Sequence, residues 1–155
     1  MRNLKKFKIN PESFLEILNH LHLLGVNDLS LHSQNLNSST AFIALNGKNS
    51  HGLNFLADAI AAAVPCIIID AEEIHDARLL EKTLPILAIE NLKENLGNFA
   101  SHFYDHPSQK LSLHAFTGTS GKTSCSQFLA QALNIIGKRC GIIGTLGIGI
   151  WPDLT

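Results

Sequence analysis

The sequence is poor in cysteine, which excludes a disulfide-stabilised scaffold. Its 155 residues include three cysteines, Cys66, Cys125 and Cys140, an odd number that cannot pair completely within the chain. Cys66 and Cys140 lie in apolar, strand-like runs, where small buried thiols are common. We interpret Cys125 as a packed thiol too, since the sequence places no histidine to activate it. The pattern favours a reducing compartment, and we expect a cytoplasmic protein.

The chain also lacks a long apolar run and an excess of charge of one sign. Its most apolar window, residues 53–69, is interrupted by polar residues and a proline, so no membrane span is predicted. The basic start, residues 5–8, leads into Asn10 and Pro11 rather than into the apolar part of a signal peptide, and we interpret it as a solvated tail. Twelve Lys and Arg against thirteen Asp and Glu give a formal net charge of -1. We therefore expect no membrane partner and no nucleic-acid partner.

Apolar residues are plentiful, at 45% of the chain, and they alternate between helical and strand-like spacing. Helical spacing predicts helices over residues 11–24, 53–64 and 91–104. Compact apolar runs predict strands over residues 41–45, 66–70 and 85–89, with a shorter strand near Leu29 and Leu31. This alternation predicts an α/β fold with a largely parallel sheet.

A glycine-bearing turn near the end of the chain predicts a phosphate site. The apolar run 111–116 predicts a strand, residues 117–123 form the turn, and a helix over residues 127–136 and a strand over 140–144 follow. Glycines let backbone N–H groups approach a ligand, and the mouth of a helix attracts anions. Lys122 could reach the outer phosphates of a nucleoside triphosphate, and the Thr123 hydroxyl could bind the accompanying Mg²⁺.

The spacing of this turn narrows the class of protein. Residues 118–123 match the short pattern G-x-x-G-K-T, whereas Phe116 stands where the longer P-loop template requires glycine. Switch GTPases normally keep the longer template, so the short form argues against them. A turn that binds no ligand remains an alternative, although the lysine at the helix mouth opposes it.

The polar, proline-containing segment 105–110 predicts a domain boundary, with one domain over residues 1–106 and a second over residues 107–155. The second domain has too few predicted strands to bury both faces of a parallel sheet. Either the chain is part of a longer protein, which we favour, or its last part completes the sheet of the first domain.

Several motifs together resemble the Mur ligases, the ATP-dependent amide-forming enzymes of bacterial peptidoglycan synthesis. Residues 116–124 are similar to the family's T-G-T-N-G-K-T-T loop, with Ser120 in place of asparagine. Residues 143–147 resemble its G-T-L-G strand end, and residues 103–108 its F-Y-x-x-P-S linker. Residues 40–52 resemble its D-x-F-x-A-x-x-G-x-x-x-D-G stretch, with Thr40 and His51 where acids are usual.

A second upstream motif departs further from the family pattern. Residues 31–34 align with L-D-S-R but carry His32 and Gln34 in place of aspartate and arginine. His51 could contact a phosphate or cap the helix after Gly52, and the sequence leaves both roles open.

The resemblance implies an N-terminal Rossmann-like UDP-sugar-binding domain followed by the beginning of a P-loop ATPase domain. Lys122 and Thr123 would be catalytic, and Thr123 would also bind Mg²⁺. The residues expected to hold ATP are Gly118, Thr119, Ser120, Gly121, Lys122, Thr123 and Ser124. Those expected to contact the UDP-N-acetylmuramoyl group are Leu31, Ser33, Lys48, Asn49 and Ser50.

The implied reaction is ATP-dependent addition of a third amino acid, meso-diaminopimelate or L-lysine, to UDP-N-acetylmuramoyl-L-Ala-D-Glu through an acyl phosphate. The implied partners are UDP-N-acetylmuramoyl-dipeptide and a diamino acid, with the protein a monomer. Family chains are much longer, so this one would be an N-terminal fragment that is inactive by itself. Alternatives are the ligase adding D-Ala-D-Ala, a folylpolyglutamate synthetase-like ligase, and a nucleotide-binding module without catalysis. Thr145 and Leu146, in the G-T-L-G motif, favour the enzyme that adds the third residue.

Overall fold

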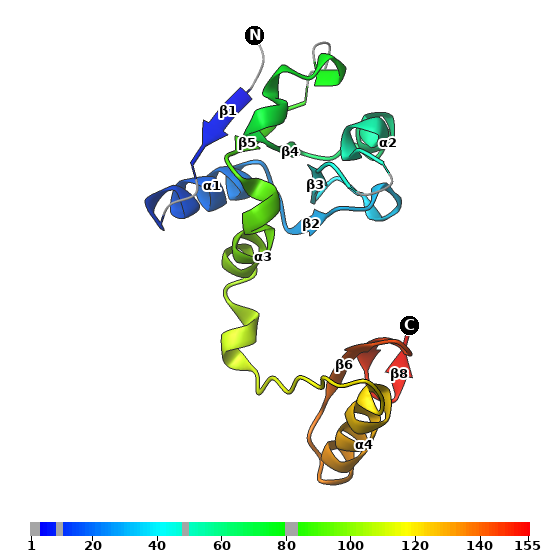
Figure 1. The fold of residues 1–155 in the computed structure, drawn as a ribbon. Helices are drawn as coiled ribbons and strands as arrows, with labels where there is room; N and C mark the ends of the chain where they lie inside the picture. Colours follow the sequence, from blue (N-terminus) through cyan, green and yellow to red (C-terminus); the bar gives the residue numbers. More distant parts are fainter. Residues whose placement is uncertain (1–3, 9–10, 48–49, 80–83) are drawn as a thin grey trace. The chain divides into compact units, whose positions relative to one another are not determined.

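The chain forms two compact units, Met1–Lys110 and Leu111–Thr155 (Figure 1). The computed structural model describes residues 4–8, 11–47, 50–79 and 84–155. Lys48 and Asn49, two of the residues expected to contact a UDP-sugar, lie outside the described residues.

A five-stranded parallel sheet forms the centre of the first unit. Its strands are β1 (Leu4–Phe7), β2 (Asp28–Ser30), β3 (Thr40–Ala44), β4 (Ile67–Asp70) and β5 (Ile86–Ile89). They lie in the order β1-β5-β4-β3-β2, and every neighbouring pair is parallel. The predicted α/β fold with a parallel sheet is confirmed.

The strand order determines which face each connection covers. The chain crosses the whole sheet from β1 to β2 and then returns strand by strand from β2 to β5. Because crossovers between parallel strands are right-handed, opposite directions of travel place the connections on opposite faces. The helix α1 (Pro11–Leu23) therefore lies on one face, and the short helix α2 (Leu56–Ala61) lies on the other.

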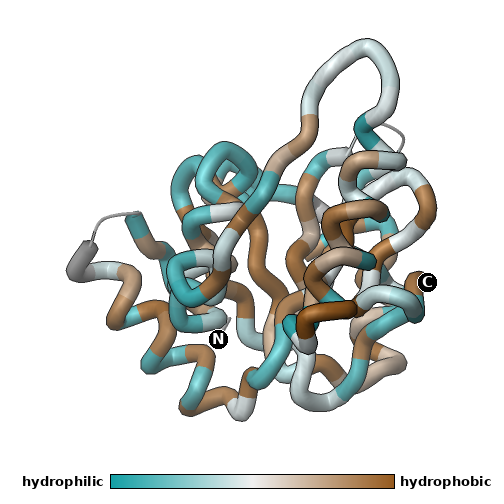
Figure 2. Tube along the Cα trace, turned by 90° about the horizontal axis from the view of Figure 1, so that it is seen from below, coloured by the Kyte–Doolittle hydropathy of each residue, from teal (hydrophilic) through white to brown (hydrophobic). Residues whose placement is uncertain are grey.

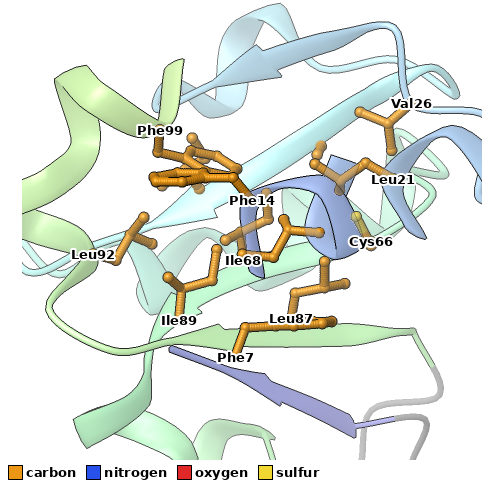
Figure 3. Close-up of a cluster of buried hydrophobic side chains, with 13 residues drawn as sticks. Phe7, Phe14, Leu21, Val26, Cys66, Ile68, Leu87, Ile89, Leu92 and Phe99 are labelled. Carbon is orange, nitrogen blue, oxygen red and sulfur yellow. The ribbon is translucent and has the colours of Figure 1, made fainter. Parts of the chain in front are cut away.

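Two helices cover the first face of the sheet (Figure 3). Phe14 and Leu21 of α1 and Phe99 of α3 (Leu92–Phe103) pack with Ile68 and Leu87 of the strands. The rings of Phe14 and His102 stack with centroids 4.0 Å apart, which joins α1 to α3. Figure 2 shows brown and teal segments alternating along the trace, as expected where helices turn one side to a core and the other to water.

The second face carries the alternate side chains of the same strands. Phe42, Ile67 and Ile69 point away from the first cluster and pack with Leu53 and Leu56. Leu53 belongs to the 3-10 turn Gly52–Phe55 that precedes α2. Ile67, Ile68 and Ile69 are fully buried in alternation on the two faces, which is why the strand is an uninterrupted apolar run.

The basic start of the chain is a strand rather than the solvated tail that the sequence suggested. Leu4–Phe7 pairs with β5 at the edge of the sheet, and Phe7 is buried. Lys5 and Lys6 remain exposed, and Lys6 lies 3.6 Å from Glu90. The sequence signal was weak because only the ends of this strand are apolar.

Polar contacts also fix the end of α3 to β2. The Tyr104 hydroxyl donates to Asp28 and accepts from the Leu29 N–H at 3.1 Å. Desolvation and the hydrogen bond to Asp28 raise the pKa of Tyr104.

The second unit contains α4 (Lys122–Ile135) and an antiparallel sheet of β6 (Gly141–Gly144), β7 (Gly147–Ile150) and β8 (Asp153–Leu154). Trp151 Nε1 donates to Gln127 Oε1 at 3.1 Å, which links the sheet to α4. This sheet is separate from the five-stranded one, so the alternative in which the last part completes the first sheet is wrong.

The strand predicted over residues 111–116 is also wrong. No described segment pairs with these residues, and β6 pairs with β7 instead. Leu111 and Leu113 are 64% and 72% exposed. An apolar run becomes a strand only where another strand satisfies its backbone groups, and within the described ranges this one has no such partner.

Among the residues that the structure describes, no helix is long and apolar enough to cross a membrane.

The three cysteines differ in accessibility. Cys66 is buried, Cys140 is partly buried, and Cys125 is exposed, which overturns the expectation of a packed Cys125 thiol. Burial raises the pKa of the Cys66 thiol to about 12.

We predict that a thiol-reactive disulfide at pH 8 modifies Cys125 in the folded chain, and that it modifies Cys66 more than about a hundredfold more slowly. The thiolate is the reacting form, and little of it is present at Cys66. Mass spectrometry of digested protein locates the label, and equal labelling of both thiols would contradict the prediction.

Candidate functional site

The turn of residues 117–121 ends at an uncapped helix mouth. Gly118 and Gly121 have φ values of 141° and 79°, a region that glycine adopts without strain. Gly121 directly precedes α4, and no side chain caps the helix there. The first helical hydrogen bond is donated by Cys125 N–H to Gly121 O at 2.9 Å. The backbone N–H groups of residues 122–124 therefore lack partners within the helix, and such groups bind anions.

The side chain of Lys122 folds back over this turn. Its Nζ donates to Gly118 O at 2.6 Å, which holds the ammonium group beside the free N–H groups. An ammonium has three donors, and Gly118 O is the acceptor that Lys122 has within the part of the chain that the structure describes. The first turn of α4 contains no acidic residue to compete with an anion. The turn and the start of α4 thus bring free backbone N–H groups and an ammonium group together, which suits an anion.

The Thr123 hydroxyl, beside the turn, suits a metal ion that is also bound by the phosphates of a ligand. Thr123 is partly buried, and none of the hydrogen bonds among the described residues involves its hydroxyl. The same residues contain no group of three or more His, Cys, Asp or Glu side chains that could hold a metal ion. Mg²⁺ commonly binds through one or two protein oxygens together with substrate phosphates. Thr123 could supply one such oxygen.

An open cavity of about 530 Å³ lies within the second unit. Residues 112–116, the start of α4 and residues 140–146 line it. Lys122 and Thr123 border the cavity, whereas the rest of the predicted ATP residues do not. The cavity therefore reaches the start of α4 but not the turn before it. Its apolar lining residues come from both segments, among them Leu113, Phe116, Ile142 and Leu146.

In the first unit, the predicted sugar-nucleotide residues follow neighbouring strands. Leu31 and Ser33 come directly after β2, and Ser50 lies in the loop after β3. Because β2 and β3 are adjacent and parallel, their following loops share one edge of the sheet, where ligands of open α/β sheets bind. Leu31 is 48% exposed, and Ser50 is also exposed.

Backbone hydrogen bonds join the described parts of the loop after β3, residues 45–47 and 50–52, which we call the β3 loop. Gly52 N–H donates to Leu45 O at 2.8 Å, and Gly47 N–H donates to Ser50 O at 3.0 Å. Gly52 passes so close to β3 that an added Cβ would lie 2.6 Å from the Ala44 Cα. Only glycine fits this approach without a shift of the backbone.

His51 anchors the end of the β3 loop. Its Nδ1 accepts from Leu53 N–H at 3.1 Å, so of the two roles considered for this residue the structure contains the cap. Its Nε2 lies 2.9 Å from Glu73 Oε1. Desolvation raises the pKa of Glu73, and the neighbouring His51 partly opposes that rise. Sequence reasoning missed Glu73 because it lies in a polar segment without periodicity.

A second polar contact lies beside this pair. Arg78 binds Asp76 through two nitrogens, with the shorter contact at 2.6 Å, and donates to Asn54 Oδ1 at 2.5 Å. The hydrogen bonds from Arg78 hold the pKa of Asp76 well below its usual range. The segment after β4 is therefore tied to the end of the β3 loop through His51 and to the turn that follows it through Asn54.

The chain is similar in sequence to known ligases. The chain is 38% identical over 130 residues to UDP-N-acetylmuramoyl-L-alanyl-D-glutamate--2,6-diaminopimelate ligase of Pseudomonas putida, covering 83% of this chain and 26% of the ligase. It is 37% identical over 149 residues to the ligase of the same name from Wigglesworthia glossinidia brevipalpis, covering 95% of this chain and 29% of that one. The chain is a partial homologue of these Mur ligases. No family model matches it.

A solved structure supports the fold of this Mur ligase homologue. A structure of UDP-N-acetylmuramoyl-L-alanyl-D-glutamate--2,6-diaminopimelate ligase matches with a TM-score of 0.55 at 24% identity, over 84% of this chain and 26% of the other. This likeness concerns the α/β fold alone. The homologue spans between a quarter and a third of the length of the relatives it matches.

Two glycine substitutions test the packing of the β3 loop. We predict that Gly52→Ala lowers the free energy of unfolding by about 1–3 kcal/mol, because the new methyl group collides with the β3 backbone. Gly97→Ala is the control, since Gly97 lies in α3 with open space around it, and this change should stabilise by about 0.5–1 kcal/mol. Urea unfolding measures both, and equal stability of the two variants would contradict the packing described here.

Proposed function

We propose that this chain supplies the UDP-sugar-binding unit and the first part of the ATP-binding unit of an ATP-dependent amide ligase. The enzyme would add meso-diaminopimelate or L-lysine to UDP-N-acetylmuramoyl-L-Ala-D-Glu during peptidoglycan synthesis. The observation that carries the proposal is the uncapped mouth of α4 with the Lys122 ammonium held over it at 2.6 Å from Gly118 O. The names of the relatives support the choice of substrate.

ATP would bind with its phosphates at the turn of the second unit. The backbone N–H groups of residues 118–124 and the Lys122 ammonium would neutralise the charge of the phosphate oxygens. Exchange of the Gly118 carbonyl for a phosphate oxygen would give the ammonium a charged acceptor, which forms a stronger hydrogen bond. Mg²⁺ would supply further charge neutralisation, and the Thr123 hydroxyl would be its protein ligand in this part of the enzyme.

The chemistry activates a carboxylate toward an amine. The γ-phosphoryl group of ATP passes to a carboxylate oxygen of the dipeptide, which gives an acyl phosphate and ADP. The amine then attacks the carbonyl carbon, the C–O bond to phosphate breaks, and inorganic phosphate leaves while the amine loses a proton. Lys122 would act by stabilising negative charge on the phosphoryl group in transit. The proposed enzyme would act in the cytoplasm, where we expect a monomer.

The UDP part of the substrate would bind at the edge of the parallel sheet. Leu31 and Ser33 after β2 would meet Ser50 of the β3 loop around the nucleotide. Lys48 and Asn49, which precede Ser50 in the sequence and lie outside the described residues, are proposed as further contacts. The first unit therefore holds the sugar nucleotide, and the second holds ATP. Recognition of the amino acid and the remaining catalytic groups would belong to the part of the ligase that this chain does not span.

Calorimetry with the chain as it stands tests the proposal. We expect UDP and UDP-N-acetylmuramoyl-dipeptide to bind, and ATP with Mg²⁺ to bind without preference for guanine. A ligase of the folylpolyglutamate synthetase kind would not bind the UDP-sugar, and guanine-selective binding would indicate a switch protein. A chain that binds neither UDP nor ATP would overturn the proposed function.

Replacement of the lysine at the helix mouth tests the ATP site alone. We predict that Lys122→Ala weakens ATP binding about tenfold to a hundredfold, the loss expected for a hydrogen bond between charged groups. Lys138→Ala is the matched control, because Lys138 is an exposed lysine beyond the far end of α4. UDP binding should remain unchanged in both variants. Wild-type ATP affinity in Lys122→Ala would show that the turn is not the phosphate site.

A further inference from the structure

We propose that Glu73, acting through His51, is a positioning residue that fixes the β3 loop for binding of the sugar nucleotide. The inference rests on the proposed function, since that function assigns Ser50 of this loop to the UDP-sugar. The carrying observation is one imidazole ring with a different partner at each nitrogen: Leu53 N–H at 3.1 Å from Nδ1, and Glu73 Oε1 at 2.9 Å from Nε2.

These two contacts determine where the proton of the ring lies. A backbone N–H can only donate, so Nδ1 of His51 must accept and carries no hydrogen. A neutral imidazole has one N–H group, which must then be at Nε2, where it donates to Glu73 Oε1. Glu73 thereby selects the tautomer whose other nitrogen is free to cap the turn beginning at Gly52.

The environment of Glu73 makes this contact the main restraint on its carboxyl group. The side chains of His51 and Glu73 are 18% and 17% exposed. Within the described ranges, His51 provides the hydrogen bond to Oε1, while the buried Oε2 has no partner. A carboxyl group held in this way is desolvated, in agreement with the raised pKa of Glu73. Desolvation of a carboxylate costs free energy, and a carboxylate that served no purpose here would avoid this cost by staying in water.

The backbone that carries Glu73 is itself firmly placed. Ala71 packs in the second hydrophobic cluster, and Asp70 Oδ1 accepts from Glu72 N–H at 3.3 Å at the start of this turn. Asp76 N–H donates to Glu73 O at 3.0 Å at its end. Because its backbone is fixed to the sheet, Glu73 can restrain the position of His51 and, through His51, that of the neighbouring Ser50.

Loss of this restraint should loosen the loop without unfolding the sheet. Ser50 precedes His51 directly, and its carbonyl accepts from Gly47 N–H at 3.0 Å, so a shift of His51 moves both sides of the turn. The ring would then be free to rotate, and the cap on Leu53 N–H would be lost for part of the time. The nucleotide would have to restore this order on binding, which weakens its affinity.

Three substitutions separate the link to Glu73 from the cap. Glu73→Ala removes the link. His51→Asn also removes it, since the shorter side chain cannot reach Glu73, but asparagine is a good capping residue. Glu73→Gln keeps a carbonyl oxygen that accepts from Nε2–H, although it buries an amide NH₂ and should lower stability. Glu72→Ala is the matched control, because Glu72 is the exposed neighbour of Glu73.

Calorimetry with UDP and hydrogen exchange of the Leu53 amide test the inference in the full chain. We expect Glu73→Ala and His51→Asn to weaken UDP binding about tenfold, with no further loss when they are combined. This factor is the cost of ordering a loop that has lost one internal hydrogen bond to a charged group. Glu73→Gln should bind UDP like the wild type despite lower stability, and Glu72→Ala should match the wild type in both measurements. Nitrogen NMR should find His51 protonated at Nε2.

The outcomes distinguish this inference from the proposed function. Wild-type UDP affinity and Leu53 exchange in Glu73→Ala would overturn the inference alone. UDP affinity that falls in Glu73→Gln in step with stability would show that Glu73 acts only on folding, and would also overturn it. If the wild type fails to bind UDP while Glu73→Ala speeds Leu53 exchange, the proposed UDP-sugar site is overturned and the restraint on the loop is supported.

Discussion

Backbone pairing of five parallel strands is the constraint on which the first unit depends. Strands buried on both faces leave no room for polar side chains along their length, so Ile67–Ile69 are apolar and fully buried. Polar and reactive groups must then occupy the segments that follow the strands. Leu31, the β3 loop and Glu73 all lie there, on the same edge, because every strand points the same way. The position of the candidate sugar-nucleotide site is thus a consequence of strand direction.

Much of this arrangement could be predicted from the sequence, because the signals were strong locally. The strands over 41–45, 66–70 and 85–89 and the helices around them correspond to β3, β4, β5, α1 and α3. The turn at Gly118 was recognisable because glycine, lysine and threonine at this spacing are typical of phosphate-binding turns. Phosphate binding itself rests on the proposed experiments, whereas homology to the Mur ligases is established by the sequence comparisons.

Other features depend on partners distant in the sequence, and these could not be predicted. β1 has apolar residues only at its ends and owes its strand conformation to pairing with β5. Residues 111–116 show the opposite case. Their apolar composition suits a strand, but none of the described strands pairs with them, so no strand forms. Glu73 is informative only together with His51, 22 positions earlier in the sequence. His51 stands where an acid is usual in the resembling motif, yet it performs the capping that a short acid could also perform.

The aromatic residues are distributed in a way that helps to observe each unit separately. The chain has one tryptophan and one tyrosine. Trp151 belongs to the second unit, where its indole N–H is bound to Gln127 of α4, whereas Tyr104 belongs to the first, where its hydroxyl is bound to Asp28. Indole fluorescence therefore reports on the surroundings of α4, and the ultraviolet absorption of the phenol reports on the junction of α3 with β2. Each of the two units therefore carries its own optical reporter without any added label.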